Sequence, residues 1–278
     1  DQLGCMLVMY LHSRSFSNNQ LTGPIPADIG GMTKLSYLDL SGNQLSDSIP
    51  ASVSALAQLT LLILTRNQLT GPIPGGIALL TRIVALSLAY NQLSGPIPTS
   101  IGSLATLTYL DLHSNSLSGS IPPSIASLSL LNALDLSSNQ LSGPIPEEIG
   151  AMLALTRLDL SDNHLSGSIP ATLSGLTRMA SLILTINQLT GPIPAGIGFL
   201  TRMKSLSLAY NQLSGPIPTS IGSLATLTYL GLHSNNLSGT IPPSIASLCL
   251  FNALDLSCNQ LSGPIPEEIG AMLALTTL

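Results

Sequence analysis

Three aspartates at one position of a repeated sequence are the residues whose type and spacing come closest to chemistry. Asp111, Asp135 and Asp159 follow one another at steps of 24 residues, which would place their carboxylates about 4.8 Å apart on neighbouring strands. Like charges at that distance repel one another or attract a cation. Paired carboxylates can also hydrolyse glycosides, but that reaction needs a cleft that makes the two acids unequal, and an exposed ladder of strands offers none. We interpret the aspartates as strand-end hydrogen-bonding groups or ligand contacts, and we expect no enzymatic activity.

Polar and aromatic side chains share the expected strand face with these aspartates. His113 and Tyr109 flank Asp111, and a second His–Tyr pair recurs 120 residues later, where Gly231 stands in place of the aspartate. None of the four histidines has a second His or Cys at metal-ligand spacing, so we expect neither a metal site nor a cofactor. The candidates for ligand contact are Tyr37, Asp39, Tyr109, Asp111, His113, Asp135, Arg157, Asp159, Tyr229, His233 and Asp255.

The elements that position these residues follow from an Asn that recurs every 24 residues without an insertion. Before the Asn, Leu110 and Leu112 alternate with polar residues, which is the pattern of a half-buried strand. Each strand is too short to be stable alone and must stack in parallel on its neighbours. After the Asn, a Gly permits a tight bend and flanking prolines hold an extended arm that carries Ile97 inward. The spacing of Ile101 and Leu104 then predicts a 3-10-like turn.

The recurring Asn itself has a structural interpretation. Its amide offers two donors and an acceptor, enough to satisfy turn backbone groups that stacking would bury unpaired. We therefore assign these side chains to a structural ladder. The ladder comprises Asn43, Asn67, Asn91, Asn115, Asn139, Asn163, Asn187, Asn211, Asn235 and Asn259.

The run from Leu107 to Asn115, with the Leu-Ser-Gly and Ile-Pro residues that follow such an Asn, resembles the plant-type leucine-rich repeats of receptor-kinase ectodomains and polygalacturonase-inhibiting proteins. The family frame, LxxLxLxxNxLSGxIPxxIxxLxx, is met by nearly the whole chain. The resemblance implies an α/β solenoid, a right-handed leucine-rich-repeat superhelix of 24-residue repeats with a concave parallel sheet and a convex side of 3-10 turns and loops. It also implies a non-catalytic extracellular role in binding proteins, peptides or cell-wall polysaccharides.

We expect one solenoid domain over residues 1–278, with about eleven repeats. Residues 83–158 reappear as residues 203–278 with few changes, which indicates duplication of a five-repeat block. Residues 1–18 form a degenerate first repeat. Family members usually carry Cys-paired caps at both ends, and none is visible here, so we expect either missing flanking residues or ends that meet other chains.

Individual residues depart from the family frame near the start of the chain. Cys5 replaces an Ile, Arg14 and Phe16 stand where Leu is expected, and Asp47 replaces the usual Gly. The apolar run 3–11 lacks a basic leader, so we assign it to the first repeat and not to a signal peptide. The three cysteines of the chain do not define a disulfide framework.

Composition narrows the classes of partner. Charged residues make up 8% of the chain and the net charge is −5, with no basic cluster, which argues against nucleic acid and anionic membranes. No segment has the roughly 20 consecutive apolar residues of a membrane span. The remaining partners are a protein, peptide or polysaccharide ligand, or other copies of the chain.

Two classes of function follow, with a third as a minor alternative. A recognition module would be secreted or displayed at the cell surface, where the sequon that begins at Asn236 predicts a glycan. A structural scaffold or filament subunit would assemble end to end, which the absent caps and the duplicated block favour. An ice-binding protein is the minor alternative, because Ser or Thr stands three residues after every ladder Asn and some similar plant repeat proteins bind ice.

Overall fold

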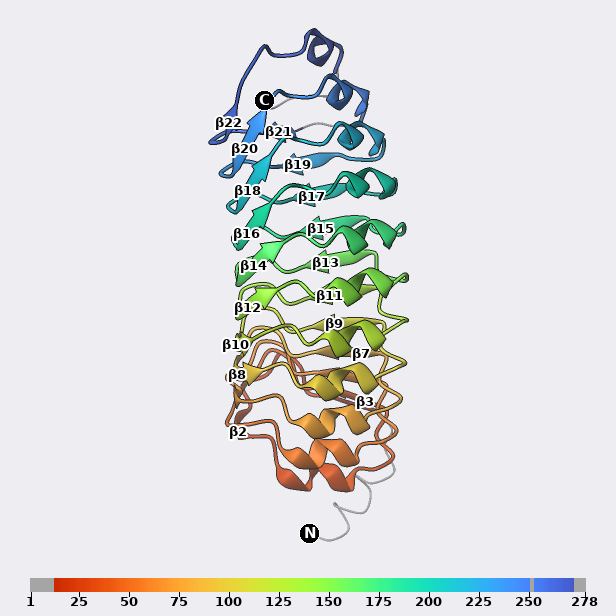
Figure 1. Cartoon of the computed structure of the whole chain (residues 1–278). Helices are drawn as coiled ribbons and strands as arrows, with labels where there is room; N and C mark the ends of the chain where they lie inside the picture. Colours follow the sequence, from red (N-terminus) through yellow and green to blue (C-terminus); the bar gives the residue numbers. More distant parts are fainter. Residues whose placement is uncertain (1–12, 251–252, 273–278) are drawn as a thin grey trace. The chain divides into compact units, whose positions relative to one another are not determined.

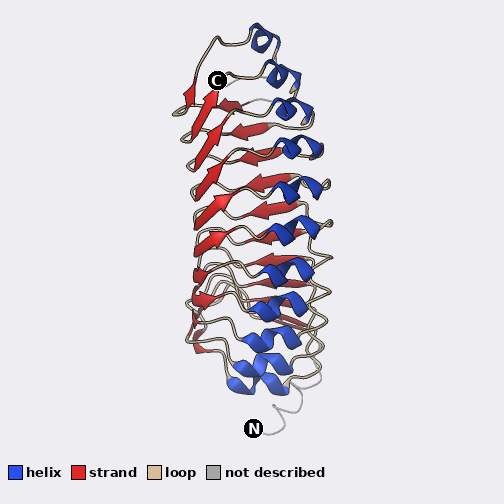
Figure 2. Cartoon of the chain, viewed as in Figure 1, coloured by secondary structure: helices blue, strands red, loops and turns tan. Residues whose placement is uncertain are grey.

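The computed structural model describes residues 13–250 and 253–272. The chain divides into two compact units, residues 1–140 and 141–278. Each unit repeats one coil, which consists of a main strand, a left-handed turn, a second strand and a 3-10 helix (Figure 1). Within each unit the 3-10 helices form a column of their own, apart from the strands (Figure 2).

In the described part of the first unit, six main strands join in one parallel sheet. These main strands are β1 (Ser13–Ser15), β3 (Tyr37–Asp39), β5 (Leu61–Ile63), β7 (Ala85–Ser87), β9 (Tyr109–Asp111) and β11 (Ala133–Asp135). The second strands are β2 (Thr22–Pro24), β4 (Gln44–Ser46), β6 (Thr70–Gly71), β8 (Gln92–Pro96) and β10 (Ser116–Gly119). The 3-10 helices are η1 (Ala27–Gly31), η2 (Ala51–Ala55), η3 (Gly75–Leu79), η4 (Thr99–Ser103) and η5 (Pro123–Ser127).

The second unit repeats this arrangement, and β12 (Gln140–Pro144) begins at the last residue of the first. Its main strands are β13 (Arg157–Asp159), β15 (Ser181–Ile183), β17 (Ser205–Ser207), β19 (Tyr229–Gly231) and β21 (Ala253–Asp255). The remaining second strands are β14 (His164–Ser168), β16 (Gln188–Gly191), β18 (Gln212–Gly215), β20 (Asn236–Gly239) and β22 (Gln260–Leu261). The 3-10 helices are η6 (Glu147–Ala151), η7 (Ala171–Gly175), η8 (Ala195–Phe199), η9 (Thr219–Ser223), η10 (Pro243–Ser247) and η11 (Glu267–Ala271).

The main strands of each unit pair in chain order, and the register follows the repeat. Tyr109 lies opposite Ala85, and Asp135 lies opposite Asp111, so each residue faces the one 24 positions away. Equivalent residues of successive coils therefore form columns across the sheet. The parallel sheet and the 3-10 turns predicted from the sequence are confirmed.

The core of each unit is a column of Leu and Ile from every coil. In the coil around β9, Leu104, Leu107, Leu110 and Leu112 have no exposed surface, and Ile97 is 2% exposed. Burial of one such side chain stabilises the fold by about 1.5–3 kcal/mol. Because a single coil has no second layer of its own, this burial exists only when coils stack. Arg14 departs from the column: it pairs with Leu38 in the sheet and is only half-buried.

Each ladder Asn joins its own turn to the preceding coil. The Oδ1 atom of Asn115 accepts a hydrogen bond from the Leu93 amide at 3.0 Å, and its Nδ2 donates to the carbonyls of Leu88 and Leu112, both at 3.1 Å. The Oδ1 contact to the amide 22 residues earlier recurs at every ladder position from Asn43 to Asn259. The side-chain amides of the ladder thus hydrogen-bond to the backbone and are not candidates for ligand contact.

The turn that follows each main strand places one residue in the left-handed region. The residue before the ladder Asn has φ between 51° and 64° in every described coil, and it is rarely Gly. Arg66, Tyr90 and the β-branched Ile186 all hold this conformation, which costs L-residues roughly 1–2 kcal/mol. Asp47 replaces Gly at a second left-handed position and keeps φ at 62°, so the substitution does not change the path of the chain.

Candidate functional site

The aspartate column is more buried than the sequence indicated. We expected the middle residues of the main strands to be exposed, but Asp39, Asp111 and Asp159 retain only 9%, 5% and 6% of their surface. The expectation was wrong because a carboxylate at this position turns back to accept hydrogen bonds from the chain two residues on. Ser161 provides the example, with its hydroxyl donating to Asp159 at 2.6 Å. Only Asp135 and Asp255 of the candidate aspartates are half-buried.

Outer side chains close over two of these carboxylates. The Tyr37 hydroxyl donates to Asp39 Oδ2 at 3.3 Å, and Arg157 lies 3.2 Å from Asp159 Oδ2. Partial burial raises the pKa of Tyr37, and the negative charge of Asp39 and the hydrogen bond to it raise the pKa further. Two strands separate each of these pairs from the His–Tyr candidates of the same unit. In the first unit, β5 and β7 lie between β3 and β9. In the second unit, β15 and β17 lie between β13 and β19.

The most connected group of polar side chains in the first unit surrounds His113, and we call it the His113 cluster. It consists of Arg66, Ser87, Tyr90, Tyr109, Asp111, His113 and Asp135. The His113 Nδ1 atom lies 2.5 Å from Asp111 Oδ1. The other carboxylate oxygen, Oδ2, accepts hydrogen bonds from the Ser87 hydroxyl at 2.9 Å and from the Tyr109 hydroxyl at 3.2 Å. Each oxygen of Asp111 is thus held by a different set of partners.

Aromatic contacts fix the position of the imidazole in this cluster. The Tyr90 ring meets the His113 ring edge to face, with centroids 4.5 Å apart and planes at 80°. The Arg66 guanidinium lies over the same Tyr90 ring, 5.3 Å from its centroid, a cation–π arrangement. Tyr90 and Tyr109 are 46% and 41% exposed, so the cluster presents two aromatic surfaces above an ordered polar layer.

The second unit carries a related group, the His233 cluster, formed by Tyr210, Tyr229, Gly231, His233 and Asp255. The Tyr210 and His233 rings meet edge to face at 4.9 Å. Because Gly231 provides no carboxylate, His233 Nδ1 instead approaches Asp255 Oδ2 on the next strand, at 3.1 Å but without hydrogen-bond geometry.

Asp255 keeps the strand-end hydrogen bonds of the other aspartates. Its Oδ1 accepts from the Ser257 amide at 3.0 Å and from the Ser257 hydroxyl at 2.6 Å. The hydroxyl bond lowers the pKa of Asp255 most, partial burial opposes it, and the Ser257 amide and the nearby His233 lower the pKa further.

Sequence reasoning missed Arg66, Tyr90 and Tyr210. All three occupy the left-handed position before a ladder Asn, which we had treated as a turn and not as part of the strand face. One signal was available: each Tyr precedes a His by 23 residues, in both copies of the duplicated block. Asn236, the predicted glycan acceptor, begins β20 with an exposed side chain.

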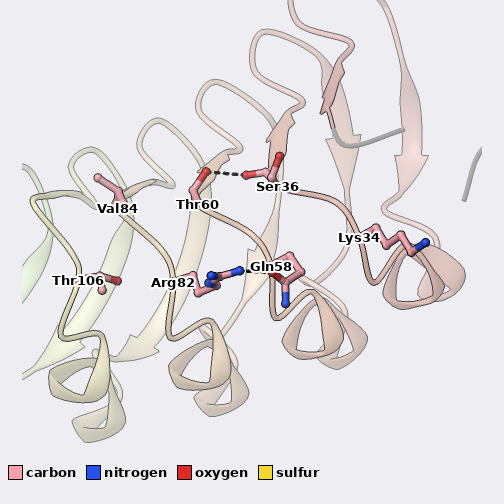
Figure 3. A pocket seen from close by; sticks show the side chains of 7 residues that line it. All are labelled: Lys34, Ser36, Gln58, Thr60, Arg82, Val84 and Thr106. Carbon is pink, nitrogen blue, oxygen red and sulfur yellow. Dashed lines mark hydrogen bonds between the residues drawn. The ribbon is translucent and has the colours of Figure 1, made fainter. Parts of the chain in front are cut away.

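A groove lies in the first unit between the main sheet and the 3-10 helices, and none of the residues singled out in the sequence lines it. It encloses about 630 Å³ and is lined by Lys34, Ser36, Gln58, Thr60, Arg82, Val84 and Thr106 (Figure 3). Arg82 hydrogen-bonds to Gln58, and the Thr60 hydroxyl donates to the Ser36 carbonyl at 2.8 Å. The groove is mostly apolar inside and has two cationic side chains at its lining, so it is a weaker candidate for specific recognition than the His113 cluster.

The coil, its Asn ladder and its columns of Leu define a solenoid protein of stacked parallel strands. Residues 81–141 match the family description "Leucine rich repeat", and residues 34–56, 154–176, 202–224, 226–248 and 252–272 match "Leucine Rich Repeat". The chain belongs to the leucine-rich-repeat family and is of the plant type. No relative was found among the curated proteins.

Solved structures give the same assignment. The plant peptide hormone receptor RGFR1, solved in complex with RGF2, is 36% identical, with a TM-score of 0.84 over 95% of this chain and 46% of the receptor chain. A TDR receptor is 31% identical, with a TM-score of 0.91 over 98% of this chain and 51% of that one. A plant ice-binding protein is 30% identical, with a TM-score of 0.67 over 91% of this chain and 74% of that one. This chain therefore spans about half the length of the receptor chains it resembles.

Within the part of the chain that the structure describes, no helix has the length and apolar character needed to cross a bilayer.

Proposed function

We propose that this chain is a non-catalytic extracellular recognition module that binds a peptide on its main-sheet face, around the His113 cluster. The observation that carries the proposal is the cluster itself: exposed Tyr90 and Tyr109 rings stand beside a carboxylate–imidazole pair that is already ordered by its neighbours. Groups that are fixed before binding lose little conformational freedom on binding.

The chemistry of the cluster suits an extended peptide. Tyrosine rings offer contact area at a low entropic cost, and Tyr and Arg are the side chains enriched at binding hot spots. Arg66 and the carboxylates of Asp111 and Asp135 provide charges of both signs within the same cluster. The similarity to a receptor solved with a peptide hormone supports a peptide over the protein and cell-wall polysaccharide ligands that also remain compatible with the fold.

The test is selection from a random peptide phage library on the immobilised full chain. Peptides enriched on the native chain should lose enrichment on a Tyr90→Ala/Tyr109→Ala variant. The matched control is Gln58→Ala/Thr106→Ala in the lateral groove, which should bind the same peptides as the native chain. Thermal unfolding of each variant verifies that the fold is retained.

Two outcomes would overturn the proposal. Enriched peptides that depend on the lateral groove and not on the tyrosines would move the binding surface. A chain that selects no peptide and instead forms polymers whose length grows with concentration, measured by light scattering, would support the scaffold alternative of end-to-end assembly.

The extracellular part of the proposal rests on the receptor ectodomain relatives and on the exposed sequon. Asn236 is exposed while its neighbour Asn235 is buried in the ladder, so a transferase can reach the acceptor amide. Mass spectrometry of the native protein should find a glycan on Asn236 and none on Asn235.

Ice binding is the second candidate, favoured by the similarity to a plant ice-binding protein. The hydroxyls three residues after the ladder Asn recur along the second strands, with Thr70, Thr190 and Ser214 exposed. If this array orders water, the chain will inhibit ice recrystallisation, and Thr190→Val with Thr70→Val will change that activity. Absence of both recrystallisation inhibition and thermal hysteresis excludes this function.

A further inference from the structure

Three side chains of the His113 cluster bring metal-binding atoms together. Asp111 and His113 project from the same end of β9, and Asp135 is the register partner of Asp111 on β11. One ligand atom from each of the three lies within 4.8 Å of the other two. Among the described residues, no other three His, Cys, Asp or Glu side chains converge in this way.

The two carboxylates and the ring are oriented by groups outside this triad. Ser87 and Tyr109 hold Oδ2 of Asp111, so its Oδ1 faces the imidazole. Ser137 holds Oδ1 of Asp135 through its amide and its hydroxyl. Tyr90 stacks edge-on against the His113 ring. Hydrogen-bonded outer partners of this kind orient metal ligands and strengthen binding about 10–100-fold.

We propose that Asp111, His113 and Asp135 bind one Zn²⁺ ion. One imidazole nitrogen with two carboxylate oxygens is a donor set that suits zinc, with bonds of about 2.0–2.2 Å and a fourth position open to water. Donor atoms in such a site lie about 3.3 Å apart. Side-chain rotations that move the donor atoms of the three residues by roughly 1 Å would bring them to that spacing. Zinc takes the Nδ1 lone pair, and the neutral ring keeps its proton on Nε2.

The duplicated block provides an internal control. In the second copy Tyr229, His233 and Asp255 occupy the equivalent positions, but Gly231 replaces Asp111. Two donors are left, and Asp255 is far more exposed than Asp111, with side-chain exposures of 47% and 7%. The chain should therefore bind one Zn²⁺ and not two. The local spacing of His and Cys does not indicate this donor set, because its third ligand, Asp135, lies on the next strand.

The experiment is calorimetric titration of the full chain with ZnCl2, together with visible absorption on addition of CoCl2. Exposed Cys249 and Cys258 are replaced by Ser, the residue at the equivalent positions of the first copy, and Cys5 is also replaced by Ser, so that thiols cannot bind the metal. We expect one Zn²⁺ per chain and cobalt absorption without thiolate bands. Asp111→Asn and Asp135→Asn should each weaken binding by more than about 100-fold, because a direct ligand is lost and not only an outer partner.

The matched controls use the second copy. His233→Asn should leave the affinity and the stoichiometry unchanged, and Gly231→Asp should create a second site and raise the stoichiometry to two. Circular dichroism verifies that each variant is folded. If Asp111→Asn does not fold, His113→Gln, at a half-buried position, takes its place as the variant that loses a ligand. No uptake of zinc, uptake that ignores these substitutions, or a stoichiometry of one in Gly231→Asp would each overturn the proposal. No peptide is present in the zinc titration, so a chain that binds no zinc does not contradict the peptide-binding proposal. Likewise, a chain that selects no peptide does not contradict the zinc proposal.

Discussion

The His113 and His233 clusters are copies of one arrangement that differ at the central residue, Asp111 or Gly231, and at the edge, where Ile186 is the equivalent of Arg66. In the first copy His113 pairs with Asp111 on its own strand at 2.5 Å. In the second copy, where Gly231 stands, His233 approaches Asp255 on the following strand at 3.1 Å. Both keep the Tyr–His edge contact. Each side chain on the sheet has neighbours on the adjacent strands as well as on its own strand. When the carboxylate of its own strand is absent, the histidine therefore approaches a carboxylate of the next strand.

The largest expected effect tests whether the two copies share one core. Leu110 and Leu230 are equivalent and have no exposed surface. Replacement of either by Ala should destabilise the protein by about 2–5 kcal/mol, and by similar amounts, because each lies between Leu residues of the two neighbouring main strands. Urea unfolding measures both, with exposed Gln92→Ala as a control expected to stay within about 0.5 kcal/mol. Unequal losses of unfolding free energy would show that the two copies differ in their cores as well as on the sheet surface.

The next prediction exchanges the central residue between the copies. Asp111→Gly removes the acceptor of the Ser87 and Tyr109 hydroxyls and should cost about 1–3 kcal/mol. Gly231→Asp should cost less than Asp111→Gly, about 1 kcal/mol, at the lower end of the range for atoms added to a packed site. A new Cβ there would lie 2.6 Å from the Tyr229 hydroxyl, but this is the end of a side chain that can swing away. Thermal unfolding of the two single variants gives the comparison, and a larger loss in Gly231→Asp would contradict it.

The third prediction concerns the left-handed position that carries Arg66 in the first unit and Ile186 in the second. A β-branched residue is strained there, so Ile186→Asn should stabilise the protein by about 1 kcal/mol, a rise in Tm of about 2–4 °C. Arg66→Asn should gain less, because it also removes the contact to the Tyr90 ring. Equal rises in Tm would indicate that the cation–π contact contributes nothing.

The smallest effect concerns Asp255. Hydrogen bonding to Ser257 lowers its pKa in the folded state, so its contribution to stability is present above the unfolded value of about 3.9 and is lost as the pH falls through the folded value. Ser257→Ala should raise the pKa of Asp255 in a carboxyl NMR titration. His233→Asn should raise it less, since the histidine charge is the weaker cause. The reverse order would make the imidazole the dominant partner of Asp255.

The repeat made most of the fold predictable. Every coil has the same Leu, Asn, Gly and Ile positions, and only parallel stacking can bury Leu110 and Leu112 while the amide of Asn115 satisfies the turn. The spacing of Ile101 and Leu104 likewise predicted the 3-10 turns. Burial of the aspartates was not predictable, because alternation along a strand indicates which face a residue occupies and not how far its side chain folds back onto Ser41 or Ser161.

The sequence by itself determined the coil, its register and the columns that the coils create, because a strict 24-residue period leaves one way to align equal residues. Only the tertiary structure decided the partners within those columns. Tyr90 meets His113 from the preceding coil, Asp135 joins Asp111 from the following one, and His233 turns to Asp255. These contacts depend on side-chain rotation and on left-handed turns between coils. The repeated spacing of 23 residues pairs each Tyr with a His, but spacing along the chain does not determine either conformation.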